Sequence, residues 1–175
     1  ELLAPAKINL FLHVLHRRDD GSHELVTRMQ KIDLCDRLEI NTTDKPGIDF
    51  LCSDKDLSTP DNLVVKAAGM FLQAAVNVPF PGISIYLEKN IPVSAGLGGG
   101  SSDAGAVLSG LNRLLITPFS SQELVEMAKT IGADVPFFAV DYTAVVAGGI
   151  GERMRPVDDI EDFWIVLVNP GITIS

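Results

Sequence analysis

Residues 92–105 read Pro-Val-Ser-Ala-Gly-Leu-Gly-Gly-Gly-Ser-Ser-Asp-Ala-Gly, and this stretch decides both the fold and the kind of ligand that we expect. Four of the five residues from Gly96 to Gly100 are glycine, and apolar residues at helical spacing follow. Glycine lets a backbone approach a ligand closely, and the free N–H groups at the start of a helix bind anions. The stretch therefore predicts a loop that cradles phosphate and opens a helix, which suggests a nucleotide.

Two common phosphate-binding motifs do not match this loop. The P-loop requires Gly-Lys followed by Ser or Thr, and the chain contains no Gly-Lys pair. The dinucleotide fingerprint G-x-G-x-x-G fits Gly96 and Gly98 but meets Ser101 at the position of its third glycine. A flexible glycine linker is the structural alternative, and we disfavour it because linkers rarely lead straight into an amphipathic helix.

The composition indicates an ordinary globular protein of one domain. The chain has 175 residues, of which 46% are hydrophobic and 21% charged. A net charge of −9 disfavours a general nucleic-acid surface, so we expect no nucleic-acid partner. No apolar run approaches the length of about 18 residues that a membrane span needs, so we expect no membrane partner. Cys35 and Cys52 match neither a disulfide framework nor a zinc pattern, and we expect them to stay reduced in the cytoplasm.

The first strand that the sequence predicts covers residues 7–15, where apolar and other residues alternate. One face, which we expect to be a core face, carries Ile8, Leu10, Leu12 and Val14. The opposite face carries Lys7 and Asn9 two residues apart, so their side chains point the same way.

The remaining patterns predict a mixture of strands and helices. Strand patterns occupy residues 28–43, 47–52, 83–89, 143–147 and 163–168. Helical spacing runs from Leu63 to Ala75 with Asp61 as N-cap, from Ser101 to Leu115, and from Ser120 to Ile131, where Ser120 and Glu123 form a capping box. Because the strands come in groups and not in strict alternation with helices, we expect an α+β fold.

Several polar residues around the glycine loop have both a structural and a functional interpretation. Ser101 and Ser102 suit phosphate binding and also N-capping. For Asp103 we favour a role in the first helical turn, where it complements the helix dipole, over a role as ligand to Mg²⁺. Asp134, between Gly-Ala and Val-Pro, is either the N-cap of a short helix or a base that accepts the proton of a hydroxyl nucleophile.

A lysine close to Asp134 would keep that carboxylate ionised, and Lys7 is the natural candidate, although spacing does not establish that the two residues meet. Of the three histidines, His13, His16 and His23, the last lies in a glycine-containing turn where a ligand has room to approach.

With these pieces in place, the chain resembles the GHMP kinases. Pro5–Leu10 is similar to their first motif, and Pro92–Ala104 is similar to their phosphate loop. The resemblance implies the N-terminal GHMP kinase domain, which is like domain 2 of ribosomal protein S5, over residues 1–160. It also implies that residues 161–175 begin a second, C-terminal domain, most of which lies beyond Ser175. We therefore expect an apolar face that this part of the protein leaves uncovered.

A narrower resemblance within the family rests on four stretches, residues 4–12, 21–25, 91–105 and 132–138. It implies ATP-dependent phosphorylation, in non-mevalonate isoprenoid biosynthesis, of the 2-hydroxyl of a cytidine diphosphate ester of methylerythritol. By this resemblance Lys7 and Asp134 are the catalytic pair, while Asn9 and His23 contact the substrate. ATP would contact Pro92, Val93, Ser94, Ala95, Gly96, Leu97, Gly98, Gly99, Gly100, Ser101 and Ser102, with Asn62 and Lys89 at the adenine pocket.

ATP chemistry also implies Mg²⁺, for which Ser102 and Asp103 are the candidate ligands. The family's turn reads Gly-Tyr-His, whereas this chain has Ser22, which has no ring to stack on cytosine. The alternatives are a homoserine or mevalonate type of GHMP kinase, and a nucleotide-binding module without catalysis. The resemblance implies a cytoplasmic enzyme, or one of the plastid stroma if the source is a plant.

Overall fold

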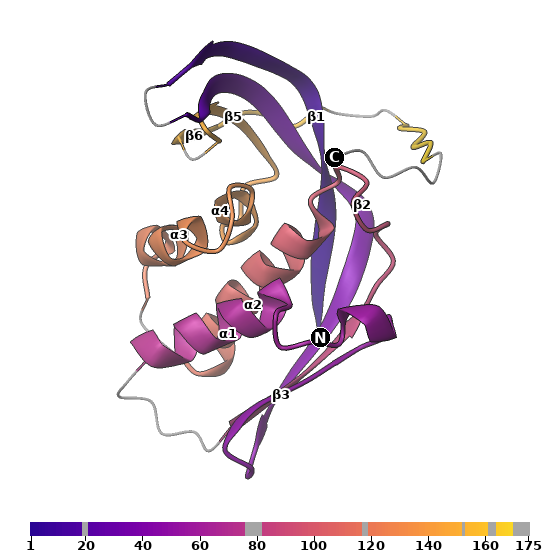
Figure 1. The fold of residues 1–175 in the computed structure, drawn as a ribbon, viewed down its shortest axis with the longest axis vertical. Coiled ribbons are helices and arrows are strands. Elements are labelled where there is room, and N and C mark those ends of the chain that lie inside the picture. Colours follow the sequence, from indigo (N-terminus) through magenta and orange to yellow (C-terminus); the bar gives the residue numbers. More distant parts are fainter. Residues whose placement is uncertain (19–20, 76–81, 117–118, 152, 161–163, 170–175) are drawn as a thin grey trace.

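The computed structural model describes residues 1–18, 21–75, 82–116, 119–151, 153–160 and 164–169. In these residues one sheet holds β1 (Leu2–Arg17), β2 (His23–Thr43), β3 (Gly47–Cys52), β4 (Gly82–Glu88), β5 (Ala144–Gly149) and β6 (Arg153–Pro156). The helices are α1 (Leu63–Ala74), α2 (Gly99–Leu114), α3 (Ser121–Lys129) and α4 (Val135–Phe138), with a 3₁₀ turn, η1, at Lys55–Leu57. The expected α+β class is confirmed, since the helices all lie on one side of the sheet (Figure 1).

Strand β2 is the central element of the sheet, which runs in the order β3-β4-β2-β5-β6. One edge of β2 pairs with β1, and the other edge pairs with β5 near its start and with β4 near its end. All of these pairings are antiparallel, and only β3 and β4 run parallel. As a result, a single 21-residue strand connects both halves of the sheet.

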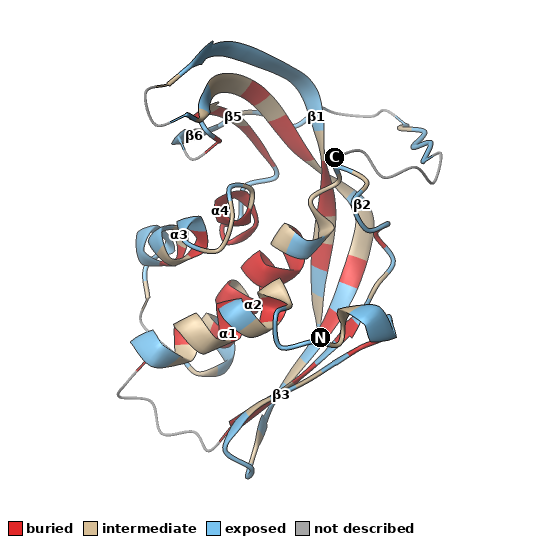
Figure 2. Ribbon diagram, viewed as in Figure 1, coloured by how far each residue is buried: buried red, intermediate tan, exposed pale blue. Residues whose placement is uncertain are grey.

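The main core lies between the sheet and helices α1 and α2. Figure 2 shows buried segments along α2 and in the strands of the sheet. The largest side chains that are fully buried there are Leu38, Val64, Phe71, Ile83, Ile85, Leu87, Val107, Leu108 and Leu111. A smaller cluster, which includes Met29, Phe137 and Val145, packs α4 against β2 and β5. Helix α4 is thereby held at a fixed place beside the sheet.

The helix starts differ from the expected caps in two places. Asn62, and not Asp61, caps α1, because its Oδ1 accepts a hydrogen bond from the Val64 backbone N–H at 2.9 Å. Helix α2 begins at Gly99 after Gly98, whose φ of 71° is left-handed, so neither predicted serine caps it. The capping box at the start of α3 is confirmed.

The predicted core face of the first strand is wrong beyond Ile8. Leu10, Leu12 and Val14 are exposed, because the helices cover only the part of β1 near Ala4 and Ala6. The hairpin of β1 and β2 continues past the helices, and Figure 2 shows its outer strand exposed there. A register shift between Asn9 and Phe11 also interrupts the alternation.

The last predicted strand, residues 163–168, is not found. Residues 164–168 belong to no strand, and residue 163 lies outside the described residues. The strand that does complete the sheet, β6, was missed because Arg-Met-Arg-Pro is too short and polar to carry an alternating pattern.

Neither cysteine takes part in a disulfide, since Cys35 and Cys52 are both free thiols. Within the described part of the chain, we find no helix with the length and apolar character required to cross a membrane.

Candidate active site

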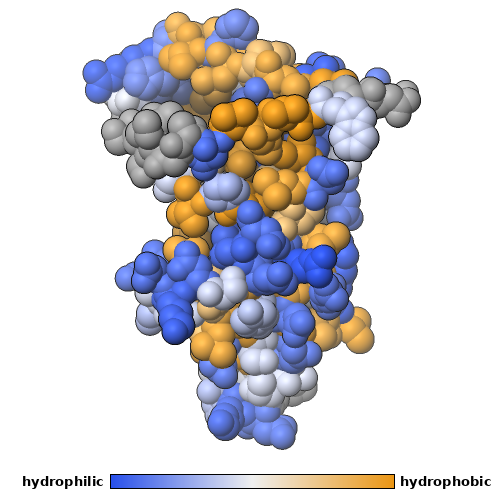
Figure 3. Space-filling view, turned by 90° about the vertical axis from the view of Figure 1, so that its right-hand side faces the viewer, coloured by the Kyte–Doolittle hydropathy of each residue, from blue (hydrophilic) through white to orange (hydrophobic). Residues whose placement is uncertain are grey.

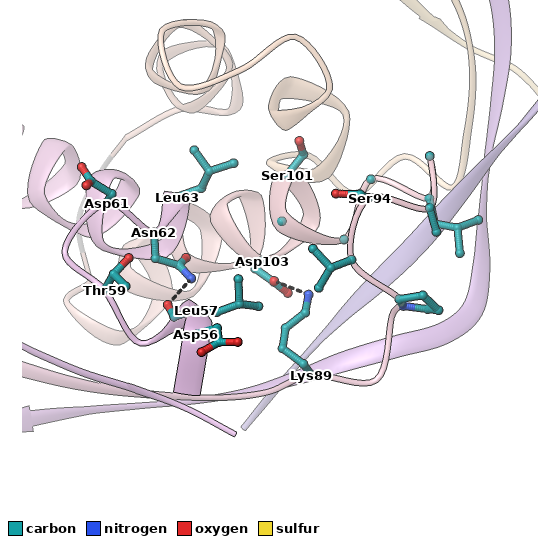
Figure 4. A pocket seen from close by; sticks show the side chains of 18 residues that line it. Asp56, Leu57, Thr59, Asp61, Asn62, Leu63, Lys89, Ser94, Ser101 and Asp103 are labelled. Atoms are coloured by element: carbon teal, nitrogen blue, oxygen red, sulfur yellow. Dashed lines mark hydrogen bonds and ion pairs between the residues drawn. The ribbon is translucent and has the colours of Figure 1, made fainter. Parts of the chain in front are cut away.

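The glycine loop lies at the edge of a cleft of about 450 Å³ (Figure 4). The cleft is lined by the loop, by the start of α2, by η1 and by the residues that begin α1. The first N–H groups of the 16-residue helix α2 have no acceptor within the helix, so the positive end of its dipole lies at this cleft. The predicted loop that opens a helix is therefore present.

Two glycines in the loop have positive φ, but only one of them faces a crowded site. A Cβ on Gly98 would lie 3.1 Å from both Lys7 Cγ and the ring of Phe138. A Cβ on Gly96 would meet no atom within 4 Å. Gly98 therefore lets the loop pass close over the Lys7 side chain.

Lys7 links β1, the loop and the turn before α4. Its ammonium donates to Asn9 Oδ1 at 2.7 Å and to the Gly96 carbonyl at 2.9 Å, and it lies 3.5 Å from Asp134 Oδ2. Its backbone N–H also donates to the carbonyl of Leu97 at 2.9 Å. The structure thus brings Lys7 and Asp134 together, which sequence spacing did not establish.

Asp134 is free to act as more than a helix cap. It occupies the N-cap position of α4, yet its side chain makes no capping hydrogen bond. The carboxylate is 37% exposed, whereas the Lys7 side chain beside it is 8% exposed. An acceptor for protons is therefore reachable from solvent and lies next to a nearly buried positive charge.

A second cluster of charges is nearly buried beside the cleft, which two of its members, Lys89 and Asp103, help to line. Lys89 Nζ donates to Asp103 Oδ2 at 2.9 Å and also to Asp36 Oδ2. Asp36 Oδ1 accepts the backbone N–H groups of Asn90 and Ile91 at 2.5 and 2.8 Å. Lys89 therefore lies between two carboxylates, and Asp36 fixes the backbone that leads into the loop.

The cluster holds two carboxylates and one ammonium, which leaves one negative charge without compensation. Burial raises the pKa of Asp103 to about 7, although the ammonium of Lys89 opposes this shift. For Lys89, burial acts to lower the pKa, but the carboxylates of Asp103 and Asp36 outweigh it and the pKa is raised. Asp103 Oδ1 has no hydrogen-bond partner among the described residues. The expected first-turn role of Asp103 is wrong, since no acid lies in the first turn of α2.

The adenine and phosphate candidates line the cleft with one exception. Residues 92–101 line it, as do Asn62 and Lys89. Ser102 does not, because it is buried and its hydroxyl donates to the Pro5 carbonyl at 2.7 Å, which ties α2 to β1. The amide of Asn62 is also engaged, since its Nδ2 donates to the Leu57 carbonyl at 2.9 Å.

His23 lies apart from the Lys7 group, at the exposed start of β2. Asn9 pairs with Met29, so six residues of strand, or about 20 Å of chain, separate His23 from the level of Asn9. The hairpin bends over at this end (Figure 1), but the described contacts do not bring His23 to the cleft. Asn9, in contrast, contacts Lys7 directly.

The candidate magnesium ligands do not fit that role. The Ser102 hydroxyl donates to the Pro5 carbonyl, and Asp103, although it lines the cleft, is paired with Lys89. Over the ranges that the structure covers, no three His, Cys, Asp or Glu side chains gather in the manner of a metal site. We therefore derive no step of the chemistry through a metal held by these residues.

Sequence reasoning missed two buried residues near the site. Asp36 shares one face of its strand with Leu34 and Leu38. An acid between two apolar residues on one strand face is a sequence signal for a buried carboxylate. Thr27 gives no comparable signal. It accepts a hydrogen bond from Asn9 Nδ2 at 2.7 Å, and a threonine in a strand is ordinary.

Comparison with known proteins gives related kinases. The protein-family model described as "GHMP kinases N terminal domain" matches residues 62–142. The 4-diphosphocytidyl-2-C-methyl-D-erythritol kinase of Desulfotalea psychrophila is 54% identical over 173 residues, which cover 98% of this chain and 58% of that protein. The chain spans about three fifths of the length of the curated relatives it matches.

Solved structures agree with these relatives. The crystal structure of a 4-(cytidine 5'-diphospho)-2C-methyl-D-erythritol kinase is similar with a TM-score of 0.77 and 43% identity, over 89% of this chain and 54% of that one. Homoserine kinase from Cytophaga hutchinsonii has a TM-score of 0.61 at 19% identity, over 89% of this chain and 50% of that one. The second likeness shows the fold alone.

Proposed function

We propose that this chain is the ATP-binding portion of a GHMP kinase that acts on 4-diphosphocytidyl-2-C-methyl-D-erythritol. The reaction is phosphorylation of the 2-hydroxyl, in the non-mevalonate route to isoprenoid precursors, and we place it in the cytoplasm. The observation that carries the proposal is the 54% identity to a kinase of that name over nearly the whole chain. A homoserine acceptor has only a likeness of fold in its favour.

The charges around the cleft favour one orientation of ATP. The phosphates lie against the glycine loop and the first turn of α2, where backbone N–H groups and the helix dipole attract anions. Asp56 and Asp61 line the other end of the cleft and would repel phosphate. The adenine of ATP therefore lies at that end, beside Leu57 and Asn62.

Asp134 and Lys7 then serve the transfer itself. The substrate hydroxyl attacks the γ-phosphorus, the bond to the β–γ bridging oxygen breaks, and Asp134 accepts the hydroxyl proton. Lys7 lies 3.5 Å from Asp134 Oδ2 and is held in place by Asn9. Magnesium enters this proposal with ATP, as part of the co-substrate.

The direct test is ADP release from MgATP by the full-length protein. We expect release with 4-diphosphocytidyl-2-C-methyl-D-erythritol and none with homoserine or mevalonate. ADP release with homoserine or mevalonate, but not with 4-diphosphocytidyl-2-C-methyl-D-erythritol, would instead indicate a kinase for that other acceptor. ATP binding without release in any of the three samples would favour a nucleotide-binding module.

The variant Asp134→Asn separates catalysis from binding. We expect ATP binding to be retained and kcat to fall by about two orders of magnitude or more, because the proton acceptor is lost. Asp141→Asn is the matched control, since the Asp141 side chain is 94% exposed and pairs with Arg113 at the surface. Full turnover by Asp134→Asn would exclude the assigned role of Asp134.

A further inference from the structure

Thr27 is a buried hydroxyl that no step of the proposed reaction uses, although it is connected to Lys7. Thr27 is 2% exposed. Its Oγ1 lies 2.8 Å from the Phe11 carbonyl oxygen and 2.7 Å from Asn9 Nδ2. Asn9 Oδ1 in turn lies 2.7 Å from Lys7 Nζ. Three hydrogen bonds therefore run in series from the Lys7 ammonium to the backbone of β1.

Chemistry fixes the direction of each bond in this series. The Phe11 carbonyl can only accept, so it takes the single hydroxyl proton of Thr27. Thr27 Oγ1 must then accept from its other neighbour, so the side-chain nitrogen of Asn9 faces Thr27. The Asn9 oxygen is consequently turned toward Lys7, whose ammonium can only donate.

The end of the series is anchored in an irregular part of β1. The pairing of β1 with β2 shifts its register between Asn9 and Phe11, whereas Lys7 and Asn9 belong to one regular stretch. Bulges of this kind redirect the groups beside them and recur next to active sites. Here the Phe11 carbonyl accepts the Thr27 hydroxyl across the two strands.

We propose that Thr27 is a positioning residue for the Lys7–Asp134 pair. Its hydroxyl sets the orientation of the Asn9 amide, and Asn9 holds the Lys7 ammonium between Asp134 Oδ2 and the Gly96 carbonyl. Without the hydroxyl, Asn9 Nδ2 loses its acceptor, so the amide is free to rotate and its oxygen is held less firmly toward Lys7. The effect on rate rests on the proposed kinase activity, whereas the effect on Asn9 does not.

The first experiment removes and restores the hydroxyl in the full-length protein. Thr27→Val keeps the shape of the side chain, and Thr27→Ser restores the hydrogen bonds. The control, Thr42→Val, makes the same change at an exposed site on the same strand. We expect Thr27→Val to lower kcat by at least about tenfold with the KM for ATP unchanged, because small misplacements of reacting groups are costly. We expect Thr27→Ser to regain most of this rate and Thr42→Val to match the wild type.

The second experiment needs no substrate. The side-chain amide resonances of Asn9, identified by their loss in Asn9→Asp, should shift and exchange faster with water in Thr27→Val but not in Thr27→Ser. Unchanged resonances in Thr27→Val would overturn the proposal, as would a wild-type kcat in an active enzyme. If the valine variant does not fold, Thr27→Ala removes the same hydroxyl. A protein inactive with every acceptor would refute the kinase function, and the amide resonances would still decide the role of Thr27.

Discussion

Asp103 couples the site to the stability of the whole chain through a buried carboxyl. Its carboxyl is buried beside Lys89 and Asp36. At a pH between its ordinary pKa and its raised pKa, Asp103 therefore keeps its proton in the folded protein and loses it in the unfolded chain. The ordinary pKa of 3.8 is raised to about 7 by burial. The contribution to stability is fully present below about pH 4 and is lost as the pH rises to about 7.

The variant Asp103→Asn tests this coupling, because an amide keeps an acceptor for Lys89 but binds no proton. We expect the free energy of unfolding of the wild type to fall relative to that of Asp103→Asn between pH 5 and pH 8, by on the order of 2–3 kcal/mol. Chemical denaturation at both pH values measures the difference. The exposed Asp49→Asn serves as control, and a difference that stays constant with pH would contradict the assignment.

At the scale of elements, the contact of α2 with α4 sets the position of Asp134. A Cβ on Gly105 of α2 would lie 2.5 Å from Phe138 Cβ and 2.6 Å from its backbone carbon. Backbone atoms cannot rotate away, so any side chain at residue 105 forces the two helices apart. Asp134 directly precedes α4 and would move with it.

We therefore expect Gly105→Ala to destabilise the protein by about 1–3 kcal/mol and to lower kcat, although alanine favours helices over glycine by about 1 kcal/mol. Gly110→Ala in the same helix is the control, since its Cβ would meet the flexible ends of Leu2 and Ile40 instead of backbone. Thermal unfolding and turnover measure the two effects. Equal stability and rate in both variants would show that the helix contact does not position Asp134.

The helices and strands also show which structural features the sequence predicts and which it does not. Helix α2 was predicted within two residues of its bounds, because its apolar spacing and glycine loop are local signals. The exposed face of β1 was not predicted, because burial depends on how far distant helices reach along a strand. The Asp36–Lys89–Asp103 cluster was missed for the same reason, as Asp36 and Lys89 lie 53 positions apart. The Lys7–Asn9 contact was predictable because strand alternation places both on one face.

At the scale of the whole molecule, one face carries much apolar surface. Figure 3 shows apolar side chains over the upper half of the face that it presents. Leu12 and Val14 are more than half exposed, and Trp164 is 97% exposed. Because the relatives are longer than this chain, we propose that residues 161–175 begin a second domain that covers such surface.

Trp164, the only tryptophan in the chain, reports on this covering. We expect its fluorescence to be blue-shifted and protected from acrylamide in the full-length protein, compared with residues 1–175 alone, because burial removes it from water. Subtracting the spectrum of Trp164→Phe isolates its signal in each form. Equal quenching of Trp164 in both forms would contradict the proposal.

The double role of β2 has a further consequence, for the order in which the protein assembles. Pairing with β1 closes a short turn, whereas contact of Gln30 with Thr143 joins residues 113 positions apart. Closing a long loop carries a larger entropy cost and slows folding. We therefore expect the Lys7–Asn9 contact, which is local to β1, to form before Asp134 docks beside it. Under the proposed roles, a chain in which Asp134 has not yet docked lacks its proton acceptor, so we expect ATP turnover to begin only once folding is complete.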